Sequence, residues 1–226
     1  MRINDRLTHG IFCDEVKNRF RCIVSVDGED QLCYVVSSCR LSNFLNLKNR
    51  EVILLPASKN ATATAYTLLG AKTERGYTLL NLGMANEIIR EQLYRRYFSF
   101  LGKRKIIERE KLVHGYKADL FIPDTNTIIE IKTVLEEKKD ALFPTVFSER
   151  ALRQFTKIKQ MLVAGYRVCY IFVALSSKTK VIHIKKDTEF SHCFKECVAL
   201  GMQYRACGIR LSEENVEICR MLDVSI

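Results

Sequence analysis

Two carboxylates and one lysine have the spacing needed for metal-assisted phosphodiester chemistry. Asp119 lies in one alternating run, and Glu130 and Lys132 lie two residues apart in the next. Side chains alternate along a strand, so Glu130 and Lys132 point to one side while the flanking isoleucines point to the core. If the two runs pair as a hairpin, Asp119 and Glu130 converge. Because neighbouring carboxylates repel one another, such a pair favours Mg²⁺ or Mn²⁺, which prefer oxygen ligands.

The lysine adds a second part of the same chemistry. A metal-bound water beside an ammonium group is a better nucleophile toward a phosphodiester. Lys132 is placed to orient that water or to stabilise charge that develops on the phosphate. Taken alone, an Asp followed by Glu-x-Lys is a weak signal, because charged residues alternate with isoleucine on any half-exposed strand. The choice depends on the elements that surround these residues.

The second half of the chain has the pattern of a mixed α/β unit. Two strands, 118–122 and 128–134, flank a turn and are expected to form a hairpin. A helix is predicted from Ser148, a good N-cap, to Gly165, a good C-cap. The almost wholly apolar run that follows predicts a strand covered on both faces. The remaining predicted elements are this strand at 166–175, a strand at 181–184, a helix at about 188–200 and a strand at 202–209.

The first half has the spacing of a small β-barrel. Short apolar or alternating runs, broken by turn signals, extend from residue 11 to about 82. Near Asn86 the apolar period becomes helical and continues to Gly102, with Asn86 as the expected N-cap. We therefore predict two closely packed units, residues 1–84 and 85–226. The strands predicted in the first unit are 20–26, 32–36, 52–55, 62–69 and 77–82.

The charge balance favours a polyanionic partner. The 226 residues include 36 Lys and Arg against 26 Asp and Glu, a formal net charge of +10. Nucleic acid is the simplest partner for such a surface. No apolar stretch is long enough for a spanning helix, and no secretory signal is recognisable. We expect a cytoplasmic protein that does not associate with membranes.

The nine cysteines are expected to be reduced thiols, because their number is odd and no signal directs the chain to an oxidising compartment. A zinc site is the alternative, but the only candidate cluster lacks a C-x-x-C pair and lies partly in an amphipathic helix. That cluster is His192, Cys193, Cys197 and Cys207.

Several short motifs, in order along most of the chain, resemble those of the sugar fermentation stimulation protein A family. They include Asn18-Arg19-Phe20, Arg40-Leu41, Glu110 nine residues before Asp119, Glu130-Ile131-Lys132, and Phe143-Pro144 with Glu149-Arg150. The resemblance implies an α+β and α/β protein. An OB-fold-like small β-barrel would precede a PD-(D/E)XK, restriction-endonuclease-like domain with a mixed central sheet.

The chain departs from the family pattern beside the predicted site. Tyr116-Lys117 replaces Ser-Arg, Thr145 replaces Asp, and Arg153-Gln154 replaces Lys-His. The resemblance thus implies a preserved metal-binding core with altered substrate contacts.

The hairpin and the resemblance together define the predicted site. Asp119, Glu130 and Glu110 are the expected catalytic metal ligands for Mg²⁺ or Mn²⁺, with Lys132 as the fourth catalytic residue. Phe20, Tyr34 and Phe44 of the barrel could stack on bases. The expected nucleic-acid-binding residues are Arg19, Arg40, Lys117, Arg150, Arg153, Arg95, Arg96, Lys103 and Arg104.

Two functions follow from this site. The first is a nucleic-acid-binding protein, with DNA as the favoured partner, that carries a metal-dependent nuclease site. The alternative is a non-catalytic DNA-binding regulator that affects sugar metabolism genes and keeps the same carboxylates as silent ligands. Spacing and charge do not distinguish DNA from RNA or define the oligomeric state.

Overall fold

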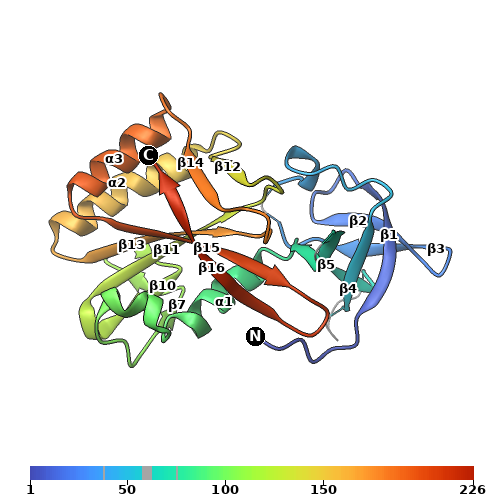
Figure 1. Ribbon diagram of the computed structural model, residues 1–226. Helices are drawn as coiled ribbons and strands as arrows, with labels where there is room; N and C mark the ends of the chain where they lie inside the picture. Colours follow the sequence, from blue (N-terminus) through green and yellow to red (C-terminus); the bar gives the residue numbers. More distant parts are fainter. Residues whose placement is uncertain (38, 58–62, 75) are drawn as a thin grey trace.

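A closed five-stranded barrel forms the first unit of the computed structural model, which describes residues 1–37, 39–57, 63–74 and 76–226 (Figure 1). Four antiparallel pairings join β1 to β2, β2 to β3, β1 to β4 and β4 to β5. A parallel pairing of β3 with β5 closes the ring. The strands are β1 (Thr8–Glu15), β2 (Arg21–Val26), β3 (Glu29–Tyr34), β4 (Glu51–Pro56) and β5 (Tyr66–Thr73).

The barrel closes around the alternating apolar residues of its strands. Cys22 and Val24 are fully buried on β2, as the period-two pattern requires. Gly10 lets β1 approach β2 closely, because a Cβ there would lie 2.6 Å from Val24 Cγ1. The small barrel expected from the sequence is confirmed. The strand expected at 62–69 is β5 at Tyr66–Thr73, and residue 62 lies outside the described residues.

A mixed sheet forms the second unit and continues from the barrel through β6. Its order is β6-β15-β13-β11-β10-β7, with β11, β13 and β15 parallel and β10 antiparallel to β11. The mixed sheet predicted for this unit is confirmed, and so is the antiparallel pairing of its two hairpin strands. The strands on this path are β6 (Gly76–Leu79), β7 (Glu108–Arg109), β10 (Leu120–Ile122), β11 (Thr127–Val134), β13 (Arg167–Ala174) and β15 (Gln203–Leu211).

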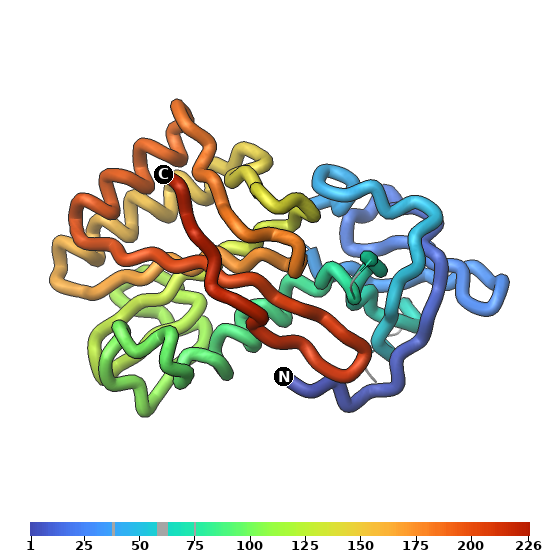
Figure 2. Tube along the Cα trace, in the orientation of Figure 1, coloured from blue at the N-terminus to red at the C-terminus, as the bar shows by residue number. Residues whose placement is uncertain are grey.

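Three strands beside this path extend the second unit. β12 (Asp140–Phe143) pairs with β14 (Val181–Ile184), and β14 and β15 both pair with β16 (Val216–Ser225). The β15–β16 hairpin runs alongside the N-terminal segment (Figure 2). There, Ile3 N donates to Glu214 O at 2.8 Å. Sequence periodicity did not predict β12, which is only four residues long, or β16, whose charged residues interrupt the apolar pattern. The small β8–β9 hairpin joins Leu112–Val113 to Tyr116–Lys117.

Helices cover both faces of the mixed sheet (Figure 1). α1 (Gly83–Gln92) packs into the core shared with the barrel, which also holds Ile129 and Ile131. α2 (Glu149–Val163) and α3 (Glu189–Ala199) cover the opposite face, where they form a second core with Ile128 and Phe172 of the sheet. The predicted N-cap is confirmed, since the Ser148 hydroxyl accepts a hydrogen bond from Ala151 N at 3.3 Å. In the part of the chain that is described, no helix is long and apolar enough to cross a membrane.

The helix expected between Asn86 and Gly102 differs from the prediction at both ends. α1 begins at Gly83, because turns at Asn81 and Leu82 start it before Asn86. The helix ends at Gln92, and a 3₁₀ segment (η2, Arg96–Leu101) follows as far as Gly102. The Arg104 guanidinium donates to the carbonyl of Leu93 at 2.6 Å and so satisfies the end of α1.

Candidate active site at the Asp119–Glu130 hairpin

Asp119 and Glu130 meet where the β10–β11 hairpin opens. Leu120 pairs with Ile129 in the antiparallel register, so the next step of this register places Asp119 opposite Glu130. Asp119 Oδ2 instead accepts a hydrogen bond from Ile131 N at 2.8 Å. The aspartate carboxylate thereby takes the place of a backbone carbonyl as the acceptor for the Ile131 N–H of β11. The expected convergence of the two carboxyl groups is present, since the register places Asp119 opposite Glu130 and the negative charge of Glu130 acts on Asp119.

Glu130 is buried by α2 and satisfied by three donors. Only 1% of the residue is exposed. Its Oε2 accepts from the Tyr116 hydroxyl at 2.6 Å, and its Oε1 accepts from Lys132 Nζ at 2.6 Å and from Gln154 Nε2 at 2.5 Å. Side chains alternate between the two faces of β11 as predicted, but the face that carries Glu130 is covered by α2 and is not exposed to solvent. A buried carboxylate requires such donors because losing its hydration is costly.

Gln154 connects the lysine to the tyrosine. Lys132 Nζ donates to Gln154 Oε1 at 2.7 Å, and Gln154 Nε2 also donates to the Tyr116 hydroxyl at 3.2 Å. Four side chains from β9, β11 and α2 thus form a closed hydrogen-bond network around Glu130. Tyr116 and Gln154 stand at positions where the sequence departs from the family pattern. This departure was the only feature of the sequence that drew attention to these two residues, and it did not reveal that they contact Glu130.

The negative charge of Asp119 and Glu130 is only partly neutralised by the nearby Lys132. Burial, followed by the negative charge of Glu130, raises the pKa of Asp119 to about 6. The hydrogen bond from Ile131 and the charge of Lys132 oppose this shift. Burial and Glu130 also raise the pKa of Tyr116, which therefore remains a hydrogen-bond donor. Among the described residues, Lys132 is the one cation whose charge opposes the raised pKa of Asp119.

A further buried hydroxyl lies beside this pair. Tyr170 occupies the position on β13 that pairs with Glu130, and its side chain is buried. Its hydroxyl has no hydrogen-bond partner among the described residues. Burial and the charges of Glu130 and Asp119 raise its pKa. An excess of carboxylate charge next to an orphaned hydroxyl suits a hydrated hard cation, which takes oxygen ligands and retains waters. Asp119 and Glu130 are the residues that could hold it.

The third expected ligand, Glu110, is linked to the site by its backbone. Glu110 N donates to the carbonyl of Asp119 at 3.0 Å. Its exposed carboxylate forms an ion pair with Lys117 at 2.6 Å, and this hydrogen bond lowers the pKa of Glu110. Across the described ranges, no group of three or more His, Cys, Asp and Glu side chains is arranged to hold a metal ion. The role of Glu110 as a ligand stays a prediction.

The cysteine alternative has no geometric support. Cys197 lies in the core beneath α2 and α3, whereas Cys207 lies in the core on the other side of the sheet. Burial raises the pKa of both thiols, to about 11 and about 12 respectively. These two cysteines pack as small apolar side chains, as the amphipathic pattern indicated.

The predicted basic residues have different surroundings. Arg19 and Arg150 line a cleft of about 720 Å³ between the barrel and the second unit, and Lys132 and Gln154 form part of its wall. Lys185 and Phe147 line the same cleft and had no signal in the sequence. Other predicted residues make local contacts: Arg153 with Glu149, Lys103 with Asp124, Arg40 with the Lys17 carbonyl, and Arg104 with backbone carbonyls. Arg95 and Arg96 are exposed outside the cleft.

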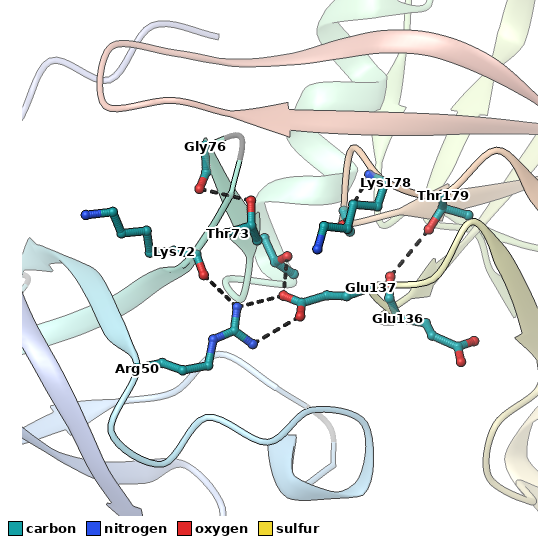
Figure 3. A network of polar contacts seen from close by, with 10 residues as sticks. Arg50, Lys72, Thr73, Gly76, Glu136, Glu137, Lys178 and Thr179 are labelled. Atoms are coloured by element: carbon teal, nitrogen blue, oxygen red, sulfur yellow. Dashed lines mark hydrogen bonds and ion pairs between the residues drawn. The ribbon is translucent and has the colours of Figure 1, made fainter.

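A second polar network lies just after the C-terminal end of β11, around Glu137 (Figure 3). The Arg50 guanidinium donates to both oxygens of Glu137, at 2.9 and 3.1 Å. The Thr78 hydroxyl donates to Glu137 Oε1 at 2.6 Å, and Arg50 also donates to the Lys72 carbonyl at 2.6 Å. Arg50 comes from the barrel, so these contacts connect the barrel to the segment after β11. Despite burial, the hydrogen bonds from Arg50 and Thr78 lower the pKa of Glu137.

The chain is similar in sequence to proteins of one known family. Residues 83–215, more than half of the chain, match the family described as "Sugar fermentation stimulation protein RE domain". The chain belongs to this family. The sugar fermentation stimulation protein homolog of Desulfitobacterium hafniense is 27% identical over 210 residues, covering 88% of each chain. The homolog of Clostridium acetobutylicum is 22% identical over 213 residues, covering 92% of each.

A solved structure shares the fold. The structure of Pyrococcus furiosus SfsA in complex with Ca²⁺ matches with a TM-score of 0.86 and 22% sequence identity. The match covers 100% of this chain and 98% of that protein. The family membership expected from the short motifs is therefore confirmed, and the low identities agree with a divergent member.

Proposed function

We propose that this member of the sugar fermentation stimulation protein family binds nucleic acid, with DNA as the favoured partner, and cleaves it at the Asp119–Glu130 site. The observation that carries the proposal is the Asp119–Glu130 pair with Lys132 hydrogen-bonded to Glu130. Burial, followed by the negative charge of Glu130, raises the pKa of Asp119, so the ionised pair does not stabilise the fold by itself. Perturbed groups of this kind are concentrated at functional sites.

Each residue of the proposed site has a distinct role. Asp119 and Glu130 would hold Mg²⁺ or Mn²⁺, which neutralises charge on the phosphate and favours ionisation of water. Lys132, which lines the cleft and hydrogen-bonds to Glu130, would orient the attacking water or stabilise negative charge at the phosphate. Tyr116 and Gln154 hold the Glu130 carboxylate in place. Glu110 stays a candidate third ligand.

The finer fold assignment belongs to the same proposal. The barrel, with its parallel β3–β5 closure, has the five-stranded form expected of an OB-fold-like unit. The hairpin bearing Asp119 and Glu-x-Lys, followed by α2, has the order expected of a PD-(D/E)XK nuclease domain. The Ca²⁺ complex of the Pyrococcus furiosus protein supports a site for a hard divalent cation in this fold.

One observation favours the non-catalytic alternative. The Glu130 carboxylate already accepts three hydrogen bonds from this chain, and two of their donors, Tyr116 and Gln154, depart from the family pattern. A cation at Glu130 has to compete with these donors. If they hold the carboxylate too firmly, the protein would bind DNA and act as a regulator without cleaving it.

Cleavage assays with Lys132→Ala separate the two functions. Single- and double-stranded DNA and RNA are incubated with purified protein and Mg²⁺, Mn²⁺ or EDTA. We expect metal-dependent cleavage that falls by about 10²–10³-fold in Lys132→Ala, because a positioned charge at the reacting group is lost. Binding in EDTA should persist. Undiminished cleavage by the variant would assign the activity to another site, and no cleavage of any substrate by the wild type would favour the regulator.

A further inference from the structure

The cleft between the two units combines unpaired cations with an apolar wall. We define it by Arg19 and Phe44 of the barrel and by Lys132, Phe147, Arg150 and Lys185 of the second unit. Its described lining includes four cationic side chains and one carboxylate, Glu189. The volume is about 720 Å³. This lining favours an anionic ligand that also presents apolar surface.

Three of these cations are available to a ligand. Arg19, Arg150 and Lys185 are exposed, and their side chains make no ion pair or hydrogen bond with the described residues. The Arg19 guanidinium lies over the Phe20 ring, whose centroid is 4.8 Å away. By contrast, the Arg153 guanidinium, one turn along α2 from Arg150, pairs with Glu149. Three cations without an ion pair to the described residues thus line the cleft.

Phe147 is the aromatic group of the cleft that is free to stack. It is 72% exposed, and its ring contacts no other described aromatic ring. The neighbouring Phe143 and Phe190 rings are packed edge to face with centroids 5.3 Å apart. An exposed phenyl ring on a cationic cleft offers a stacking surface for a base, and stacking is tolerant of sequence.

We propose that the cleft binds single-stranded nucleic acid, with its phosphates on Arg19, Arg150 and Lys185 and one base stacked on Phe147. This inference rests on the proposed function and specifies its substrate class. Bases in a duplex are paired and stacked on one another, so they cannot reach Phe147 or the apolar wall. Bases of a single strand can. Lys132 and Gln154, which line the cleft, both donate hydrogen bonds to Glu130, so a bound strand lies next to residues of the proposed site.

A tryptophan reporter tests the stacked base directly, because the chain contains no tryptophan. Phe147→Trp is compared with Val163→Trp, whose site is 79% exposed at the end of α2 and outside the cleft lining. The ligands are a twelve-nucleotide oligo-dT, a duplex of the same length and inorganic polyphosphate, all in EDTA. We expect oligo-dT to quench the Phe147→Trp fluorescence in parallel with binding measured by anisotropy. Polyphosphate should not quench it, and Val163→Trp should not respond.

Affinity measurements add a second readout. Phe147→Ala should weaken oligo-dT binding by about 5- to 100-fold, the usual range for one stacked base. Lys185→Ala should reduce the slope of log K against log salt by about 0.7, the value for one single-strand phosphate contact. Lys195→Ala is the matched control, since Lys195 is exposed on α3 and outside the cleft lining. It should leave the slope unchanged.

The outcomes distinguish this inference from the proposed function. If oligo-dT binds but neither Phe147 variant responds, the strand binds elsewhere, and the cleft assignment is wrong while nucleic-acid binding stands. If the duplex binds and quenches as well as oligo-dT, the single-strand assignment is wrong. If neither nucleic acid binds at low salt, the proposed function fails together with this inference.

Discussion

Glu130 and Glu137 are two carboxylates near one strand with opposite charge environments. Glu130 lies within β11 beside Asp119, and Lys132 supplies the one charged donor to its carboxylate. Glu137 follows the strand and faces the Arg50 guanidinium through two hydrogen bonds (Figure 3). The pKa of Asp119 beside Glu130 is raised, whereas the pKa of Glu137 is lowered. One network retains excess negative charge, and the other is balanced.

This difference indicates separate purposes for the two networks. A balanced carboxylate that connects the barrel to the end of β11 stabilises the arrangement of the two units. Excess charge beside Glu130 costs stability unless a cation compensates it, which suits a site that functions by binding one. Substitutions at Asp119 and Glu137 should therefore separate function from stability.

The largest expected effect is on cleavage. Asp119→Asn should reduce metal-dependent cleavage by about 10²–10³-fold, because one of two charged ligands is lost. Glu137→Gln should keep the activity of the wild type per folded molecule. Initial rates with Mg²⁺ or Mn²⁺ are the measurement, with circular dichroism as the control for folding. Equal losses in both variants would contradict a functional distinction between the two carboxylates.

The next effect is on stability, with opposite signs. Glu137→Gln should lower the free energy of unfolding by about 1–3 kcal/mol, because the Arg50 guanidinium loses a charged partner. Asp119→Asn should raise it by about 1–2 kcal/mol at pH 7 without metal, because a charge that is destabilised by burial and by repulsion from Glu130 is removed. Urea unfolding in EDTA measures both. A stability loss in Asp119→Asn would show that the pair supports the fold.

The smallest effect is the pH dependence of the same pair. The folded pKa of Asp119 is about 6, above its unfolded value, so without metal its contribution to stability is lost as the pH rises from about 4 to about 6. Glu137 has a lowered pKa, so its contribution is lost as the pH falls. Asp119→Asn should abolish the first trend and Glu137→Gln should weaken the second, as measured by urea midpoints between pH 4 and 7.

The pH also affects the proposed metal site. Below about pH 6 a cation has to displace the Asp119 proton, so the affinity should fall by about tenfold for each pH unit. Titration calorimetry of Mn²⁺ in two buffers with different ionisation enthalpies would detect the released proton. A metal affinity that is independent of pH would remove Asp119 from the ligand set.

Local patterns accounted for much of the fold around the site. The N-cap at Ser148, the buried strand β13 and the strand β14 at Val181–Ile184 agree with their predicted positions. The N-cap of α1 was predicted four residues late, at Asn86 instead of Leu82, because Asn is a common capping residue while the real start depends on turns at Asn81 and Leu82. β16 escaped detection because its pairing with β14 and β15, rather than its own pattern, makes it a strand.

The sequence by itself determined which face of β11 carries Glu130 and Lys132, because strand alternation is a local property of the backbone. It also placed Asp119 beside Glu130, since a short turn leaves a hairpin as the simplest pairing, although the strand predicted at 118–122 is shorter: β10 begins at Leu120 and Asp119 lies just before it. Only the tertiary structure decided that Tyr116 and Gln154 surround Glu130 and that Phe147 and Lys185 share a cleft with Arg19. These residues are distant in the chain, and periodicity encodes a face rather than a partner. Which side chains meet on that face depends on how α2 and the barrel pack against the sheet.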